Sequence, residues 1–282
     1  MMLPNPLYKY CDSRGIDILL RARLKVTPFN EFNDPFELAP RMRTEFKLED
    51  AQAMLRDPEY QRDLYKVTVG LGQFRGSFDQ FRDYILLLVA DDLAKKLVTD
   101  YPKDAAEFRE RHMEKISTEF GLICLSQIPD DILMWSHYTR GHTGFVIGFD
   151  TNDAFFAEPP VHDVIYSKER VLMGHFADLR DAPYRSDVIK NLIKTKSINW
   201  SYEHEWRQLH MLAQCTAEPD TGRQGRQLYF KPISRSAILE VVLGCRCDDR
   251  AIREVLSAAE FQHVKIRKAR IHDSEFQLVL EE

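Results

Sequence analysis

The chain has 282 residues, of which 44% are hydrophobic and 29% are charged. This length suits one large domain or two modest ones, and the composition excludes wholesale disorder and a small disulfide-stapled scaffold. The longest apolar run extends over 84–90, far below the roughly 20 residues that cross a bilayer, and the N-terminus lacks an apolar leader. We therefore expect a cytoplasmic protein with no membrane partner.

Five cysteines, an odd number without a CxxC pair, fit reduced thiols better than a disulfide framework. The formal net charge is -5, but the segment 221–270 carries eleven Lys and Arg against five Asp and Glu. That segment is therefore +6 and the remainder is -11. A solvated basic surface is the simplest interpretation, and an anion-binding face is the alternative.

The first forty residues predict a strand over 7–10, a helix over 14–21 and a second strand over 24–27. The loop PFNEFNDPFE follows; its Asn, Asp and Pro residues favour turns, and its phenylalanines would fix it to a core. From 47 to 120, apolar residues recur every three and four positions between charged ones. This spacing predicts a helical insertion.

The second half of the chain alternates strand-like and helical segments. Strands are predicted at 122–126, 144–150, 161–166, 206–212, 228–230, 238–243, 263–266 and 276–280, and helices at about 186–196 and 250–260. No glycine-rich nucleotide-binding motif occurs. The irregular alternation predicts the α+β class: a single mixed α/β domain over 1–282, with a central, largely antiparallel sheet and 47–120 as a helical insertion.

Polar and aromatic residues are unusually dense in MWSHYTRGHTGFVIGFD, at 134–150. Trp135, Ser136, His137, Tyr138 and His142 all precede a strand flanked by glycines. The two histidines are five positions apart with no Glu between them, so they do not match the HExxH zinc pattern, and we expect no metal. Hydrogen-bonded residues at a helix-to-strand corner are the structural alternative for each histidine.

A second dense segment is NWSYEHEWRQLHML, at 199–212. If it is extended, alternation sends Glu203, Glu205 and Arg207 to one face and the residues between them to the other. The neighbouring tryptophans indicate a bulky, partly buried setting, in which carboxylates are costly without a purpose. A solvated strand face with an ordinary Glu and Arg pair is the alternative.

Two shorter segments near the N-terminus complete the candidates. In the first, Lys9 lies between Tyr8 and Tyr10 in a short strand, where an ammonium group would suit a phosphate or carboxylate. The second is FNDPFE, in which Asp34 and Glu37 are equally suited to be turn and cap residues.

LYKY, FNDPFE, MWSHY and EHEWR together resemble the signature of a bacterial family called domain of unknown function 2971. The resemblance runs over nearly the whole chain except 47–120. The layout is also similar to that of ADP-ribosyltransferases, in which a first strand carries a polar NAD-binding residue and a later strand ends in a catalytic Glu, sometimes as ExE. Here Glu203 and Glu205 have that spacing, and Lys9 stands where those enzymes usually have His or Arg.

This second resemblance implies an NAD-consuming ADP-ribosyltransferase-like or NAD-glycohydrolase-like enzyme, such as a toxin or antiviral defence effector. Cleavage of the nicotinamide glycosidic bond passes through an oxocarbenium-like state, which the carboxylate of Glu205 would stabilise. Glu203 would orient or deprotonate the acceptor, while His137 and His142 would position these groups.

The same resemblance implies which residues bind NAD, the expected substrate. Tyr138 or Trp135 would stack on nicotinamide, and Lys9 with Arg207 would hold the diphosphate. Tyr8 and Ser136 complete the expected binding set. The acceptor would be a protein or a nucleic acid.

Two other functional classes remain open from the residues. A nuclease-type effector would use the basic segment 221–270 to bind nucleic acid. A non-catalytic ligand-sensing or partner-binding module would use MWSHY and EHEWR to line a polar pocket.

Overall fold

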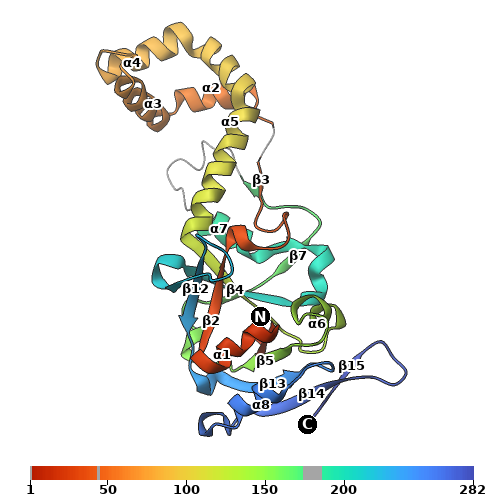
Figure 1. The fold of residues 1–282 in the computed structure, drawn as a ribbon. Helices are drawn as coiled ribbons and strands as arrows, with labels where there is room; N and C mark the ends of the chain where they lie inside the picture. The colour runs from red at the N-terminus through yellow and green to blue at the C-terminus, as the bar shows by residue number, and fades with distance from the viewer. Residues whose placement is uncertain (1, 43–44, 174–185) are drawn as a thin grey trace. The chain divides into compact units, whose positions relative to one another are not determined.

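The computed structural model describes residues 2–42, 45–173 and 186–282 (Figure 1). Helices and a large, mostly antiparallel sheet confirm the predicted α+β class. The chain forms two compact units. Unit 1 comprises Met1–Ala39, Lys115–Arg170 and Ile189–Glu282, and unit 2 comprises Pro40–Glu114 and Val171–Val188. The count of one domain interrupted by an insertion stays a prediction.

Unit 1 is built on an 11-stranded sheet with the order β11-β12-β2-β4-β1-β5-β13-β14-β15, and β10 pairs with β4 and β6. Its strands are β1 Leu7–Cys11, β2 Arg23–Pro28, β4 Phe120–Ser126, β5 Phe145–Phe149, β6 Val161–Asp163, β10 Glu205–Met211, β11 Thr216–Pro219, β12 Gln227–Pro232, β13 Ile238–Leu243, β14 Lys265–Ile271 and β15 Leu278–Glu281. Only β13 and β14 run parallel among these described pairings. A separate parallel pair joins β7 Ile165–Ser167 to β9 Thr195–Ser197.

Helices cover both faces of this sheet. They are α1 Ile16–Arg21, α6 Ile132–Tyr138, α7 Ser186–Lys194 and α8 Arg250–Leu256, with short 3-10 turns η1 Ser13–Gly15, η2 Phe29–Glu31, η4 Ala154–Phe156, η6 Ile198–Glu203, η7 Leu212–Gln214, η8 Arg235–Ala237 and η9 Ala259–Phe261. Helices α1 and α8 bury apolar residues such as Ile18 and Ile252 in the main core. Helix α6 buries Met134 and Trp135 in a second cluster.

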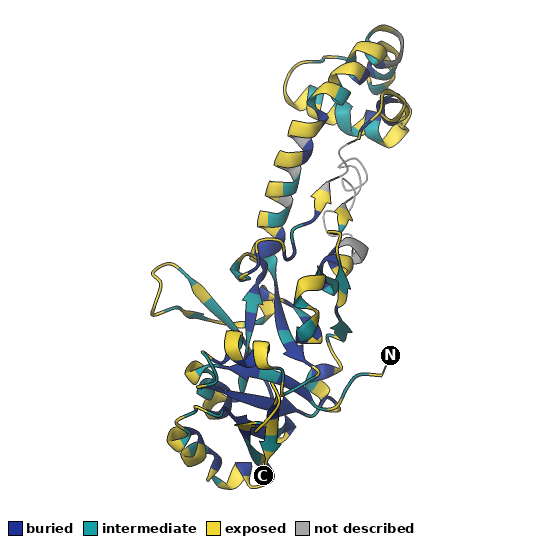
Figure 2. Ribbon diagram, turned by 90° about the vertical axis from the view of Figure 1, so that its right-hand side faces the viewer, coloured by how far each residue is buried: buried dark blue, intermediate teal, exposed yellow. Residues whose placement is uncertain are grey.

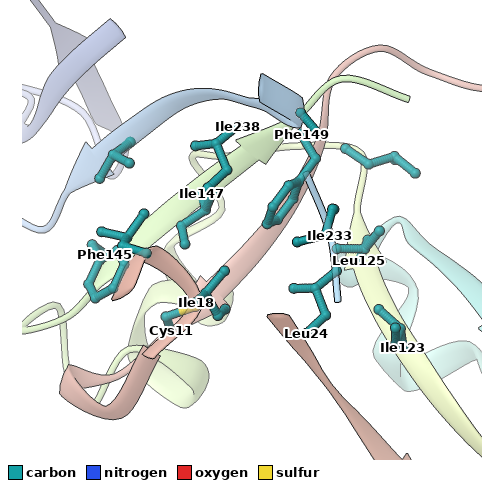
Figure 3. Packing of buried hydrophobic residues seen from close by; sticks show 14 of the residues in the cluster. Cys11, Ile18, Leu24, Ile123, Leu125, Phe145, Ile147, Phe149, Ile233 and Ile238 are labelled. Carbon is teal, nitrogen blue, oxygen red and sulfur yellow. The ribbon is translucent and has the colours of Figure 1, made fainter. Parts of the chain in front are cut away.

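Strand alternation separates these two clusters. In β1, Leu7 and Cys11 belong to the main core, whereas Tyr8 and Tyr10 belong to the cluster under α6. The main core also draws aromatic and aliphatic residues from β4, β5 and β13 (Figure 3). The central strands of the sheet, such as β5 and β13, are accordingly among the most buried parts of unit 1, whereas the outer strands β11 and β15 are largely exposed (Figure 2). The face with the main core is thus mainly apolar, although Gln208 and His210 are buried on it beside Trp206, and the Glu205 and Arg207 side chains lie on the other face.

Unit 2 is mainly helical, as the three- and four-residue spacing predicts. Its elements are α2 Leu48–Arg56, α3 Pro58–Gly70, α4 Phe78–Tyr84, the π-helical turn η3 Ile85–Val89 and α5 Ala90–Glu119, together with the parallel pair β3 Arg41–Met42 and β8 Leu172–Met173. Asp57 caps α3 through the Tyr60 N–H, and Ser77 forms a capping box with Gln80 at α4. Apolar side chains of these helices form a separate small core.

The predicted strands and the observed ones differ mainly at their ends. The predicted strand at 161–166 is divided into β6 and β7, and the one at 263–266 begins at Lys265 and continues to Ile271. The predicted helix at 186–196 ends at Lys194, where β9 begins. Strand β11 carries TAEP, a sequence without the alternation that predicts strands, and it forms by pairing with β12.

Candidate functional site

The two edges of β4 are covered differently, and this difference creates the candidate site. Strand β10 pairs with one edge along its whole length, from Phe120 to Ser126. On the other edge, β1 pairs at Ser126 and β2 pairs at Gly121 and Leu122. Strands β1 and β2 therefore separate along 123–125, and a gap opens in the sheet.

Lys9 occupies this gap. Its Nζ donates a hydrogen bond to the main-chain oxygen of Cys124, at 2.8 Å. That carbonyl belongs to the part of β4 that neither β1 nor β2 covers, so the ammonium group takes the place of a missing strand partner. Within the described residues Lys9 has no carboxylate partner, and its remaining donors are available to a ligand.

A pocket of about 470 Å³ lies at this gap, within unit 1. It is lined from β1, β2, β4, α6, η6 and β10. Six of the residues predicted from the sequence line it: Tyr8, Lys9, His137, Tyr138, Glu203 and Glu205. The structure thus brings together segments that are about 200 positions apart in the chain.

The start of β10 positions the two carboxylates. Glu205 and Arg207 share a face, as alternation predicts, while Trp206 points into the main core. The extended backbone that the prediction assumes for Glu203 is wrong, because η6 ends there and β10 begins only at Glu205. His204 between them has a left-handed backbone, with φ of 43°. This turn brings the Glu203 carboxylate to the same side as that of Glu205.

A buried cluster of ionic side chains forms one wall of the pocket. At its centre, the Lys196 ammonium lies 2.5 Å from Glu203 Oε2, 2.9 Å from Glu205 Oε2 and 3.6 Å from Glu37 Oε1. The Arg207 guanidinium binds both oxygens of Glu205, at 2.9 Å each, and also binds Glu37 Oε1. Every one of these side chains is at most 6% exposed.

Arg207 lies beneath the pocket surface, not on it. Its side chain is fully buried, and its Nη1 donates to the Ile193 carbonyl at 3.0 Å. All three nitrogens of the guanidinium therefore have protein acceptors. The structure places Arg207 as the support of Glu205 and Glu37, where a ligand diphosphate does not reach it.

The cluster holds unequal numbers of charges, three carboxyl groups against two cations. Burial raises the pKa of Glu203 to about 7, against the pull of Lys196 and with the support of the Glu205 charge. Burial also opposes the charge of Glu205, but Arg207 and Lys196 outweigh it and hold its pKa well below the usual range. Near neutral pH the pocket therefore presents one ionised carboxylate and one that exchanges its proton.

Helix α6 contributes a further part of the pocket lining, next to Glu203. Asp131 caps the helix by accepting from the N–H groups of Leu133 and Met134. At the end of the helix, Tyr138 Oη donates to Glu203 Oε1 at 2.5 Å, and His137 lines the pocket. Burial, followed by the Glu203 charge, raises the pKa of Tyr138, so the phenol stays protonated as a donor.

Trp135, Ser136 and His142 lie outside the lining of the pocket, although Met134 contributes to it. Trp135 is completely buried, packs edge-on against Tyr10, and donates to the Pro129 carbonyl. Ser136 donates to a helix carbonyl and lies 3.3 Å from His142 Nε2, and His142 stacks on Trp135. None of the three lines the pocket at the gap. They form the helix-to-strand corner that the sequence left open as a structural alternative.

Two members of the buried cluster, Glu37 and Lys196, are not predicted as site residues from the sequence. The sequence predicts Glu37 only as a turn or cap residue and gives Lys196 no role. The loop that carries Glu37 is tied to the segment before β10 by a tertiary contact, in which Asp34 accepts a hydrogen bond from Trp200 Nε1 at 2.7 Å. Lys196 is an ordinary residue at the end of a helical pattern, and no sequence signal marks it.

The basic segment 221–270 carries mostly paired charges. Arg226 binds Glu31 and Asp220, Arg253 binds Asp249, and Arg267 binds Glu240. The +6 balance of the segment is therefore largely neutralised by carboxylates, several of which lie elsewhere in the chain. This pairing does not favour a nucleic-acid-binding face.

Neither a metal nor a membrane segment emerges from the described residues. No group of three or more His, Cys, Asp or Glu side chains in this part of the chain has the arrangement of a metal site. The described helices are all too short or too polar to span a bilayer.

The fold and the pocket define an α+β protein with a buried ionic cluster beside a polar cavity. The family model described as a protein of unknown function (DUF2971) matches residues 134–208. This segment contains α6, η6 and the start of β10, so it includes Tyr138, Glu203 and Glu205 but not Lys9. The family resemblance is confirmed over these residues. Searches of curated proteins and of solved structures found no match.

Proposed function

We propose that this chain is an NAD-consuming enzyme, either ADP-ribosyltransferase-like or NAD-glycohydrolase-like. The observation that carries the proposal is the convergence of Lys9, Tyr138, Glu203 and Glu205 on one pocket at the gap in the sheet. Two carboxyl groups whose environments drive their pKa values apart are typical of an acid and base pair. The site resembles the layout that the sequence implies, with a polar residue on the first strand and an ExE motif at a later one.

In this reaction, the bond between the ribose C1′ and the nicotinamide nitrogen breaks, and its electron pair leaves with nicotinamide. The ionised Glu205 stabilises the positive charge that develops on the ribose. An acceptor hydroxyl, from water or from a macromolecule, forms the new bond to C1′, and its proton goes to Glu203. Tyr138 fixes the Glu203 carboxylate through its hydrogen bond.

The protonation of the ionic cluster makes the proposed reaction rate depend on pH. Burial also raises the pKa of Glu37, against the pull of Arg207 and Lys196. With one proton on its three carboxyl groups the cluster is neutral, and with all three ionised it carries one negative charge. As the pH rises through about 7, the pKa of Glu203, this carboxyl group loses its proton. It can then act as a base, and the pocket wall gains a negative charge. Nicotinamide release should increase over the same range.

The test is nicotinamide release from NAD by the full chain, with water, protein or nucleic acid as acceptor. We expect Glu205→Gln to lower the rate at least a hundredfold, because one carboxylate of this kind contributes several kcal/mol to the transition state. Glu218→Gln is the matched control, since Glu218 pairs with Arg23 away from the pocket. If the wild type releases no nicotinamide and NAD gives no thermal shift, the proposal fails.

A second candidate is a non-catalytic module that senses a bound nucleotide. It is favoured by one observation: both oxygens of Glu205 already accept hydrogen bonds from Arg207. A native mass spectrum with a retained small molecule, together with full biological activity in a Glu203/Glu205 double variant, would support the module over the enzyme. As an enzyme, the chain would act in the cytoplasm as a toxin or an antiviral defence effector that depletes NAD.

A further inference from the structure

The pocket has walls of opposite charge. Glu37, Glu203 and Glu205 lie on the β10 side of β4, held there by Lys196 and Arg207. Lys9, Arg14 and Lys25 line the pocket from β1, η1 and β2, on the other edge of β4. Neighbouring strands are about 4.8 Å apart, so the backbones of the strands that flank β4 on its two edges are about 10 Å apart.

Two cations of the second wall, Lys9 and Lys25, are incompletely neutralised, whereas Arg14 binds the Asp12 carboxylate through two nitrogens. Lys9 bonds only a main-chain carbonyl, and Lys25 Nζ lies 3.5 Å from Glu31, a long contact. Both oxygens of Glu31 are already taken by the Arg226 guanidinium. Burial lowers the pKa of Lys25, and the nearby charges of Arg226 and Lys9 act in the same direction. An anion bound here would relieve this accumulation of positive charge.

The first wall has an unpaired atom. Glu37 Oε2 is buried and has no hydrogen-bond partner among the described residues, although Glu37 lines the pocket. Its other oxygen is held by Arg207. A buried polar atom without a partner costs about 1–3 kcal/mol, so it calls for an explanation such as a missing ligand.

We propose that Lys9, Arg14 and Lys25 form a diphosphate seat, which orients a dinucleotide so that its far ribose and base meet the carboxylate wall and donate a hydrogen bond to Glu37 Oε2. In this seat, Arg14 and Lys25 take the diphosphate-binding role that the resemblance implies for Arg207. The identity of the ligand rests on the proposed function, whereas the seat itself is tested with inorganic pyrophosphate alone.

The experiment is calorimetric titration of the full chain with inorganic pyrophosphate and, separately, with NAD. We expect the wild type to bind both, with an affinity for pyrophosphate that falls as salt rises. Lys25→Gln should weaken both ligands at least tenfold, and Lys25→Arg should keep binding within about threefold because the charge remains. Lys231→Gln is the matched control: Lys231 lies on the adjacent β12, bonds the Gln214 carbonyl and does not line the pocket.

Absence of pyrophosphate binding to the wild type, or equal binding by Lys25→Gln and the wild type, overturns the seat. Protection of Lys25 from acetylation by pyrophosphate tests the wild type without any substitution: protection supports the seat, and equal labelling overturns it. Pyrophosphate binding without nicotinamide release would reject the catalytic proposal and retain the seat, so the two failures are distinguishable.

Discussion

The ionic cluster in the pocket wall and the ion pairs of the segment 221–270 contain the same kinds of side chains in opposite settings. Lys196 and Arg207 are at most 5% exposed and share three carboxyl groups. Arg250 and Asp248, by contrast, are 88% and 66% exposed and form a simple pair. Surface pairs of this kind are screened by water and salt and contribute little.

The comparison shows that burial and an unequal count of charges together make a group titratable near neutral pH. A buried carboxyl group that cannot be fully paired keeps its proton, as Glu203 does. A surface carboxylate with its own arginine stays ionised, and the pKa of Asp248 is lowered to about 2, first by its hydrogen bond to Arg250. A surface carboxylate that is paired with its own cation thus stays ionised near neutral pH, whereas Glu203 in the pocket can bind or release a proton there.

The largest expected effect comes from removing one cation of the cluster. Arg207→Leu leaves Glu205 and Glu37 without their shared partner in a buried site. We expect the free energy of unfolding to fall by about 3–5 kcal/mol, the usual cost of breaking a buried ion pair from one side. Urea unfolding followed by circular dichroism measures this loss. A loss below about 1 kcal/mol would show that water reaches the cluster.

The second effect concerns the proton on Glu203. Its pKa of about 7 in the folded chain exceeds the ordinary 4.5, so the folded state binds a proton that the unfolded chain releases. The stability from this proton is complete below pH 4.5 and is lost as the pH rises through about 7. Glu205 acts oppositely, because its lowered pKa adds stability that is lost as the pH falls below its ordinary value.

Glu203→Gln should remove only the first of these contributions. Between pH 5 and 7, we expect the wild type to lose on the order of 2 to 3 kcal/mol more unfolding free energy than this variant. Urea unfolding at several pH values measures the two slopes. Parallel pH profiles would mean that Glu203 titrates normally in the folded protein.

The smallest effect should come from the surface. Arg253→Gln breaks the pair with Asp249, in which the arginine side chain is half exposed. We expect a change in unfolding free energy within about 0.5 kcal/mol, and smaller still in high salt. The same urea titration checks it. A loss as large as that of Arg207→Leu would erase the distinction between the two settings.

Local patterns were enough to predict much of the sheet. Strands β1, β4 and β13 are visible in the sequence as short runs rich in apolar residues, because most of their residues are buried. The shared face of Glu205 and Arg207 follows from the same two-residue period. The strand after MWSHY is also visible in the sequence, and it begins at Phe145. Gly144 directly before it has no room for a side chain, because a Cβ there would lie 2.0 Å from the Cys11 carbonyl oxygen.

The site itself depends on contacts that a local pattern does not contain. The left-handed His204 redirects Glu203 away from the strand period, and only tertiary packing fixes that backbone. Lys196 enters the cluster because β9 pairs with β7, a short parallel pair without a sequence signal. From the sequence, Arg207 is a strand residue that could face a ligand. In the fold, Glu205 and Glu37, the latter from FNDPFE, bind its guanidinium and occupy it.

The gap between β1 and β2 also matters for how this protein meets other chains. The uncovered part of β4 is an unpaired strand edge, and such edges recruit strands from neighbouring molecules and begin aggregation. The charged amine of Lys9 occupies that edge and satisfies the Cys124 carbonyl, so an incoming strand would have to displace a cation from its hydrogen bond. The same residue that lines the candidate pocket thus also satisfies a main-chain acceptor that the sheet leaves unpaired.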